Sequence, residues 1–162
     1  MDPHSTAYHI PSALRLKGTL DVAALERSFN AVVARHQSLR TTFAEQGEQR
    51  VQVIHAQMPL SIARQAVPAG LESSQVEARI KAFVDGETHR PFDLACGPLL
   101  RVALLQVDEH DHVLALIQHH IISDGWSMQV MVGELIQHYA ADTTGQPLAL
   151  PELSVQLSLI HI

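Results

Sequence analysis

Hydrophobic positions recur with helical spacing in three stretches of the chain. The first follows Asp21, a residue suited to cap a helix N-terminus, and its pattern ends near His36. The second closes near His89, and the third begins after Gly125 and dissolves within 142–145. The apolar residues that carry the three patterns are Val22, Leu25, Phe29, Val32 and Val33; then Val76, Ile80, Phe83 and Val84; then Met128, Met131, Val132, Leu135, Ile136 and Tyr139.

Between these stretches, apolar and β-branched residues follow strand patterns. The turn-prone residues 45–48 predict one hairpin, and the polar residues 108–111 predict another. No regular pattern covers the stretch through Pro59 and Pro68. Strands interleaved with helices predict one α/β domain, an α+β layered sandwich with helices packed on a mixed sheet. The expected strands are His9–Lys17, Thr41–Phe43, Arg50–Ile54, Leu99–Val107 and His112–Ile117.

Composition narrows the class of protein. The chain has 162 residues, 46% of them hydrophobic, and its 11 Lys and Arg against 17 Asp and Glu give a net charge of −6, which disfavours nucleic acid as a partner. The lone Cys96 excludes an internal disulfide. No apolar run reaches the roughly 18 residues of a membrane span, and Met1–Ser5 lack the order of a signal peptide. We therefore expect a cytoplasmic protein with no membrane partner.

The candidate chemistry concentrates in His119–Ser127, where a strand pattern gives way to a helix pattern. Active-site side chains commonly lie at such junctions. Consecutive strand residues point to opposite faces, so we expect one of His119 and His120 to face the core and the other a cleft. Because neither a cysteine nor a serine is clearly paired with them, the histidine itself is the candidate proton-transfer group.

Two alternatives stay open for these histidines. A histidine at the edge of a core is more often a satisfied core residue than a catalytic one. The second alternative is a metal site, because His110 and His112 precede His119 and His120 in the sequence. Zinc ligands must converge, however, and in the expected hairpin His112 lies about 23 Å along an extended strand from His119. We therefore expect no metal ligand set.

Three segments together resemble a known family. His119–Ser127, here the histidine segment, is similar to the HHxxxDG motif of condensation domains of nonribosomal peptide synthetases. Arg35–Phe43, the arginine segment, resembles their RHxxLRTxF motif, with Gln37 in place of the usual Glu. Pro91–Arg101, the proline segment, resembles their PFDL and GPLLR stretch. HHxxxDG alone also occurs in other chloramphenicol acetyltransferase-like acyltransferases, and the arginine segment narrows the resemblance to peptide synthetases.

The resemblance implies a chloramphenicol acetyltransferase-like lobe and an acyl-transfer reaction. In that reaction the amine of an acceptor aminoacyl thioester attacks a donor thioester. Peptidyl carrier domains hold both substrates on phosphopantetheine arms, so the chain itself binds no cofactor directly. His120 would be the active-site histidine, and the backbone amide of Gly125 would be a donor near the developing charge.

The other motif residues have expected structural roles. Arg35 and Arg40 either end the first helix in solvent or form a buried partnership with Asp124. Trp126 is expected to pack rather than to contact substrate. The residues to which we assign motif or structural roles are His119, Asp124, Arg35, Arg40, Trp126 and Ser127.

The chain also departs from the family pattern. The family's opening SxAQxRLWxL motif is absent, and no second lobe follows the matching residues 1–156. The tail 157–162 does not match and has no evident partner segment, so we expect a truncated or frame-shifted N-terminal lobe. Its partners would be the missing C-terminal lobe, an adenylation domain, and donor and acceptor carrier domains. The alternatives are a non-catalytic module that docks a carrier domain, or another HHxxxDG acyltransferase.

Overall fold

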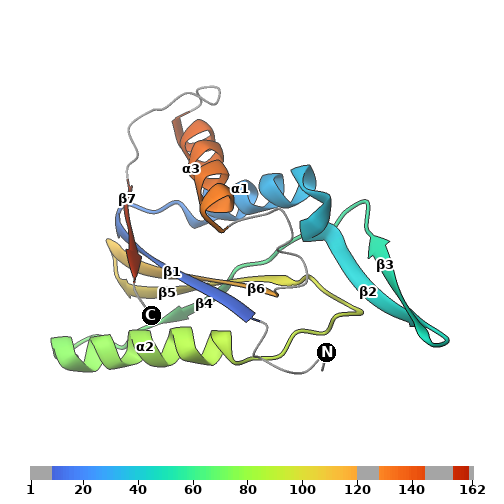
Figure 1. Cartoon of the computed structure of the whole chain (residues 1–162). Coiled ribbons are helices and arrows are strands. Elements are labelled where there is room, and N and C mark those ends of the chain that lie inside the picture. Colours follow the sequence, from blue (N-terminus) through green and yellow to red (C-terminus); the bar gives the residue numbers. More distant parts are fainter. Residues whose placement is uncertain (1–8, 120–127, 145–154, 161–162) are drawn as a thin grey trace.

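A computed structural model describes residues 9–119, 128–144 and 155–160 of the chain (Figure 1). Its centre is a five-stranded mixed sheet with the strand order β4-β5-β6-β1-β7. Strands β4 and β5 run parallel, and the other neighbouring pairs are antiparallel. The strands are β1 (His9–Gly18), β4 (Ala63–Ala66), β5 (Leu100–Asp108), β6 (Asp111–His119) and β7 (Val155–Ile160).

Helices cover both faces of this sheet (Figure 1). Helices α1 (Val22–Arg35) and α3 (Met128–Thr144) lie on one face, and α2 (Ser73–Thr88) lies on the other. Alternate strand residues supply the two cores: Leu14 packs on the α1/α3 side, and its neighbour Ala13 packs under α2. This arrangement confirms the layered α/β fold with a mixed sheet.

The arginine segment links α1 to a separate β-hairpin. After α1, residues Gln37–Arg40 form a 3-10 turn, η2, that leads into β2 (Thr41–Gln46). Strand β2 pairs with β3 (Gln49–Ile54) in a two-stranded sheet that extends away from the main body (Figure 1). Gly47 occupies the turn with a φ of 64°, a backbone conformation that glycine adopts without strain.

Most expected elements are confirmed within a few residues. The carboxylate of Asp21 accepts a hydrogen bond from the Ala24 amide at 3.0 Å, so Asp21 caps α1 as its position predicted. Helix α2 ends with His89 as its C-cap. Both expected hairpins form. No helix in the described ranges is long and apolar enough to cross a membrane.

Two strands were not predicted from the sequence. All four residues of β4 are exposed, so this edge strand lacks the apolar alternation that would have revealed it, and its parallel pairing with β5 defines it instead. The expectation that the tail has no partner segment is wrong, because Leu157 and its neighbours pair antiparallel with β1. The signal was present, since apolar residues alternate with polar ones in Val155–Leu159.

Candidate functional site

His119 is the last residue of β6, and its side chain is completely buried. Its backbone amide donates a hydrogen bond to the Leu99 carbonyl at 2.9 Å. It stands opposite His9 in the antiparallel β1–β6 pairing. It lies at an odd-numbered position of β6, like Val113 and Ala115, which pack under α2, and like Ile117, which belongs to the core on the α1/α3 side. The imidazole of His119 is therefore part of the protein interior at this end of the sheet.

Three rings surround this strand end. The His9 and Phe92 ring centroids lie 4.9 Å apart, those of His9 and His119 5.7 Å, and those of Phe92 and His119 6.0 Å, all in edge-to-face arrangements. We call His9, Phe92 and His119 the aromatic cluster. The Nδ1 atom of His9 donates to the Thr88 carbonyl at 2.7 Å, which ties the cluster to the end of α2.

Burial lowers the pKa of His9, and the nearby Arg101 and His89 lower it further, while the hydrogen bond to Thr88 opposes the shift. The ring is therefore neutral at neutral pH. A neutral imidazole can donate through Nδ1 to a carbonyl without bringing a charge into the core.

A buried ion pair borders the aromatic cluster. Glu87 on α2 and Arg101 on β5 have side chains that are 8% and 11% exposed, and Arg101 Nε lies 3.2 Å from a Glu87 carboxylate oxygen. The guanidinium carbon of Arg101 lies 4.5 Å from the centroid of the Phe92 ring, within range of a cation–π interaction. Desolvation lowers the pKa of Arg101, although arginine remains charged at any physiological pH.

The arginine segment is held to α3 and to its own hairpin. His36 Nε2 and a carboxylate oxygen of Glu134 lie 2.5 Å apart, and Arg35, which is exposed, forms a 3.7 Å ion pair with the same carboxylate. Arg40 is half-buried. Its Nε donates to the Val33 carbonyl at 3.1 Å and its Nη1 to the His55 carbonyl at 2.6 Å.

The proline segment joins the other two segments. The Phe43 amide, at the end of the arginine segment, donates to the Leu94 carbonyl at 2.7 Å. Gly97 packs so closely that a Cβ atom there would lie 2.7 Å from Thr42 Cγ2. On the other side, Phe92 contacts His119. The proline segment therefore links the arginine segment to His119, the described residue of the histidine segment, at the end of β6.

The remaining expected site residues lie outside the described ranges, among them the proposed partner of Arg35 and Arg40. These residues are His120, Asp124, Gly125, Trp126 and Ser127. Among the described residues, no group of three or more His, Cys, Asp or Glu side chains could hold a metal ion.

Sequence reasoning missed three residues of this site, namely His9, Glu87 and Arg101. Glu87 follows Ile80, Phe83 and Val84 with helical spacing, so its place on the apolar face of α2 could have been read from the sequence. An ionisable residue on a buried face needs a partner. Arg101 shares the strand face of Ala103 and Leu105, which pack under the same helix.

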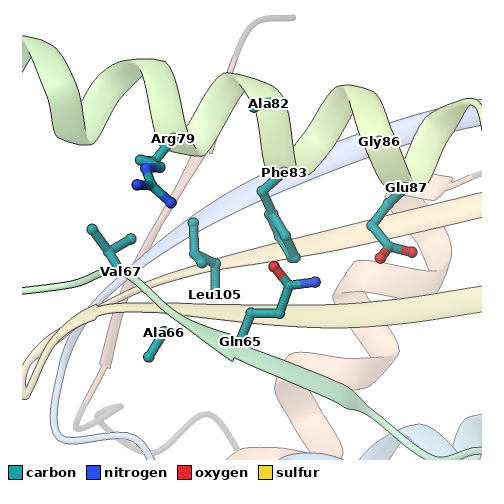
Figure 2. Close-up of a pocket in the computed structure, with 9 residues that line it drawn as sticks. All are labelled: Gln65, Ala66, Val67, Arg79, Ala82, Phe83, Gly86, Glu87 and Leu105. Atoms are coloured by element: carbon teal, nitrogen blue, oxygen red, sulfur yellow. The ribbon is translucent and has the colours of Figure 1, made fainter.

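Two hollows lie near these residues. A groove of about 260 Å³ runs between α2 and the edge strand β4, with Arg79 and Glu87 towards its two ends and Phe83 between them (Figure 2). A second cavity of about 430 Å³ adjoins the aromatic cluster, because Phe92 and Arg101 line it.

The chain is similar to known proteins both in sequence and in structure. It is 42% identical over 154 residues to a linear gramicidin synthase of Brevibacillus parabrevis, a match that covers 95% of this chain and 2% of that protein. It aligns with the SgcC5 protein of Streptomyces globisporus at a TM-score of 0.79 and 32% identity, over 94% of this chain and 34% of the other.

A third similar protein is the X-domain from teicoplanin biosynthesis, solved in complex with OxyB. The TM-score is 0.74 with 32% identity, over 93% of this chain and 31% of the other. The chain thus spans about a third of the length of these two solved relatives. The family model described as condensation domain matches residues 1–156. The chain therefore belongs to the condensation-domain family of nonribosomal peptide synthetases.

Proposed function

We propose that residues 1–156 are the N-terminal lobe of a condensation domain that forms an amide bond between two carrier-bound thioesters, with His120 as its active-site histidine. The observation that carries the proposal is the chain of contacts from the arginine segment through the proline segment to His119, the residue that directly precedes His120. A core anchored by rings and strand hydrogen bonds is a rigid base for a reactive side chain on the next residue.

In the proposed reaction, the acceptor amine attacks the donor thioester carbonyl and forms a tetrahedral oxyanion. His120 takes up a proton as the C–N bond forms, the backbone amide of Gly125 donates to the oxyanion, and the C–S bond then breaks. The carrier thiol leaves with a proton, and the peptide remains on the acceptor carrier. Phosphopantetheine arms on the carrier domains supply both thioesters.

The complete domain requires a second lobe, because two carrier-bound substrates must be aligned in a site that excludes water. The 162-residue chain alone is therefore expected to form no amide bond above a no-protein control. Residues 157–160, which pair with β1 as part of β7, lie beyond the proposed lobe.

The test uses a complete condensation domain that carries this sequence, with donor and acceptor carriers loaded with aminoacyl thioesters. Mass spectrometry of the acceptor carrier measures the dipeptidyl thioester. We expect product from the parent and from His110→Ala, the matched control, because His110 is exposed in the turn between β5 and β6. His120→Ala should abolish product formation and leave the melting temperature unchanged. An active His120→Ala variant would overturn the assignment.

A second candidate function is a non-catalytic docking module. The observation that favours it is the similarity to the X-domain, which was solved in complex with another protein. In this case the parent domain would bind carrier domains, yet neither it nor the variants would form product. Transfer to a free acceptor amine, without an acceptor carrier, would instead identify a different HHxxxDG acyltransferase.

A further inference from the structure

The ion pair of Glu87 and Arg101 has no part in the reaction proposed above, yet both residues lie beside its proposed site. Glu87 projects from α2 towards the sheet (Figure 2). Arg101 enters from β5 and meets it at 3.2 Å. A buried ion pair is weak evidence for stability, because its desolvation penalty offsets much of its attraction. The more informative property of this pair is therefore how it fixes the positions of neighbouring residues.

The guanidinium of Arg101 is fixed on several sides. Besides Glu87, its Nη2 atom donates to the backbone carbonyl of Glu87 and, at 2.8 Å, to that of Arg90. These carbonyls belong to the end of α2 and to the turn that follows it. A planar guanidinium fixed in this way presents its face to one neighbour in one orientation.

That neighbour is Phe92, whose ring centroid lies 4.5 Å from the guanidinium carbon. Phe92 in turn contacts His119 and His9 edge to face. A continuous set of contacts thus runs from Arg101 through Phe92 to the last residue of β6. Arg101 reaches the strand end through Phe92, and none of the contacts depends on a flexible surface side chain.

We propose that Arg101 is a positioning residue of this site: it holds Phe92 against His119 and so fixes the end of β6 that leads into His120. The proposal rests on the proposed function, in which His120 is the reactive residue. Lysine would keep the charge of Arg101, but it would lose the fork that engages the carbonyls and the flat face that covers Phe92.

The first test uses the 162-residue chain and reads the aromatic cluster directly. NMR of the imidazole nuclei follows the ring shifts of His119 and the titration of His9. The main variant is Glu87→Gln with Arg101→Met, which removes both charges and leaves no buried carboxylate unpaired. Because Arg101 lowers the pKa of His9, we expect that pKa to rise. The ring signals of His119 should shift as well.

The matched control is Arg79→Met, because Arg79 is an exposed arginine of α2 that lies at the other end of the groove from Glu87 (Figure 2). It should leave both sets of ring signals unchanged. Arg101→Lys should shift the His119 ring signals, since it keeps the charge but not the geometry. Unchanged His119 signals in the double variant would overturn the proposal, whatever its melting temperature.

The second test measures peptide formation by the complete domain. Loss of a positioning contact should lower kcat about 10- to 100-fold in the double variant, with little change in KM for the carrier substrates. A purely structural role would lower the melting temperature and the active fraction, but would leave kcat per folded molecule unchanged, and that result would contradict the proposal. If the parent domain forms no product, the proposed function fails, and the His119 ring signals alone decide the role of Arg101.

Discussion

The backbone amide of His119 and the carbonyl of Leu99 share a 2.9 Å hydrogen bond that joins the end of β6 to the proline segment. Leu99 directly precedes β5, which pairs with β6 along almost its whole length. The bond therefore extends the ladder by one step, to the residue before His120. The strand end that leads into His120 is thus held by backbone pairing as well as by the aromatic cluster.

Gly97 tests how closely the proline and arginine segments fit. Its φ of 58° disfavours any side chain, and a Cβ atom would meet Thr42 Cγ2 at 2.7 Å. Gly97→Ala should cost about 2–4 kcal/mol of unfolding free energy, measured by denaturant titration. Gly70→Ala is the matched control, because Gly70 has a φ of 85° but open space around it, and it should cost about 1–2 kcal/mol.

Thr42→Ser separates the clash from the backbone strain. It removes Cγ2 and keeps the hydroxyl that lies 2.8 Å from His55 Nε2. Added to Gly97→Ala, it should recover the part of the loss that exceeds the Gly70→Ala value. Equal costs for the two glycine variants would show that the segments are less closely packed than the structure has them.

Two buried histidines predict acid sensitivity. Burial lowers the pKa of His9 and of His112. In the unfolded chain both imidazoles have a pKa of about 6.5, so the unfolded state binds more protons than the folded state below that pH. Their contribution to stability is complete above pH 6.5 and is lost as the pH falls through that value.

Chemical denaturation between pH 7.5 and 5.5 measures this effect. Each group adds at most about 1.4 kcal/mol per pH unit to the slope of the unfolding free energy against pH. His9→Asn keeps a side-chain N–H for the Thr88 carbonyl and removes the titrating ring. His112→Gln removes the second titrating ring. The slope should flatten in each variant. An unchanged slope in both would contradict the burial of these rings.

The ion pair of Arg15 and Asp111 should stabilise the fold more than an exposed ion pair does. Arg15 donates to both carboxylate oxygens at 2.6 Å, and the two side chains are 18% and 14% exposed. The bond raises the pKa of Arg15. Asp111→Asn should cost about 1–3 kcal/mol in a thermal or denaturant melt.

Asp142→Asn, at the exposed pair with Arg27, is the control and should have a much smaller effect. Equal effects of the two variants would show that the Arg15 pair is screened by water as a surface pair is.

The fold was predictable where burial of one face requires apolar residues at a regular spacing along the sequence. Helix α1 shows the 3.6-residue spacing of a one-sided core, and Asp21 marks its start. Strand β4 was not predictable, because all of its side chains are exposed and its place is set by pairing with β5. Strand β7 alternates in sequence, but only its register with β1 reveals the partner. Pairing between distant segments leaves little trace in local sequence.

The site was predictable only in part for a similar reason. Adjacent histidines at a strand end made this segment a candidate site, with a core histidine as the open alternative, and His119 lies where the strand pattern placed it. His9, Glu87 and Arg101 come from three different elements, and the contacts of these residues depend on the packing of α2 over β1 and β5. Glu87 left a sequence signal through its position on the apolar face of α2, and Arg101 through its place in the proline segment.

The two adjacent histidines should have different environments, with His119 in the core and His120 accessible to substrate, and the proposed function depends on this difference. Diethyl pyrocarbonate labelling of the native 162-residue chain, read residue by residue from fragment-ion spectra, tests it most directly, with the exposed His110 as an internal reference. We predict that His120 is modified at a rate close to that of His110, while His119 is protected until the chain unfolds. Equal modification of His119 and His120, or faster modification of His119, would contradict the proposed roles of both residues.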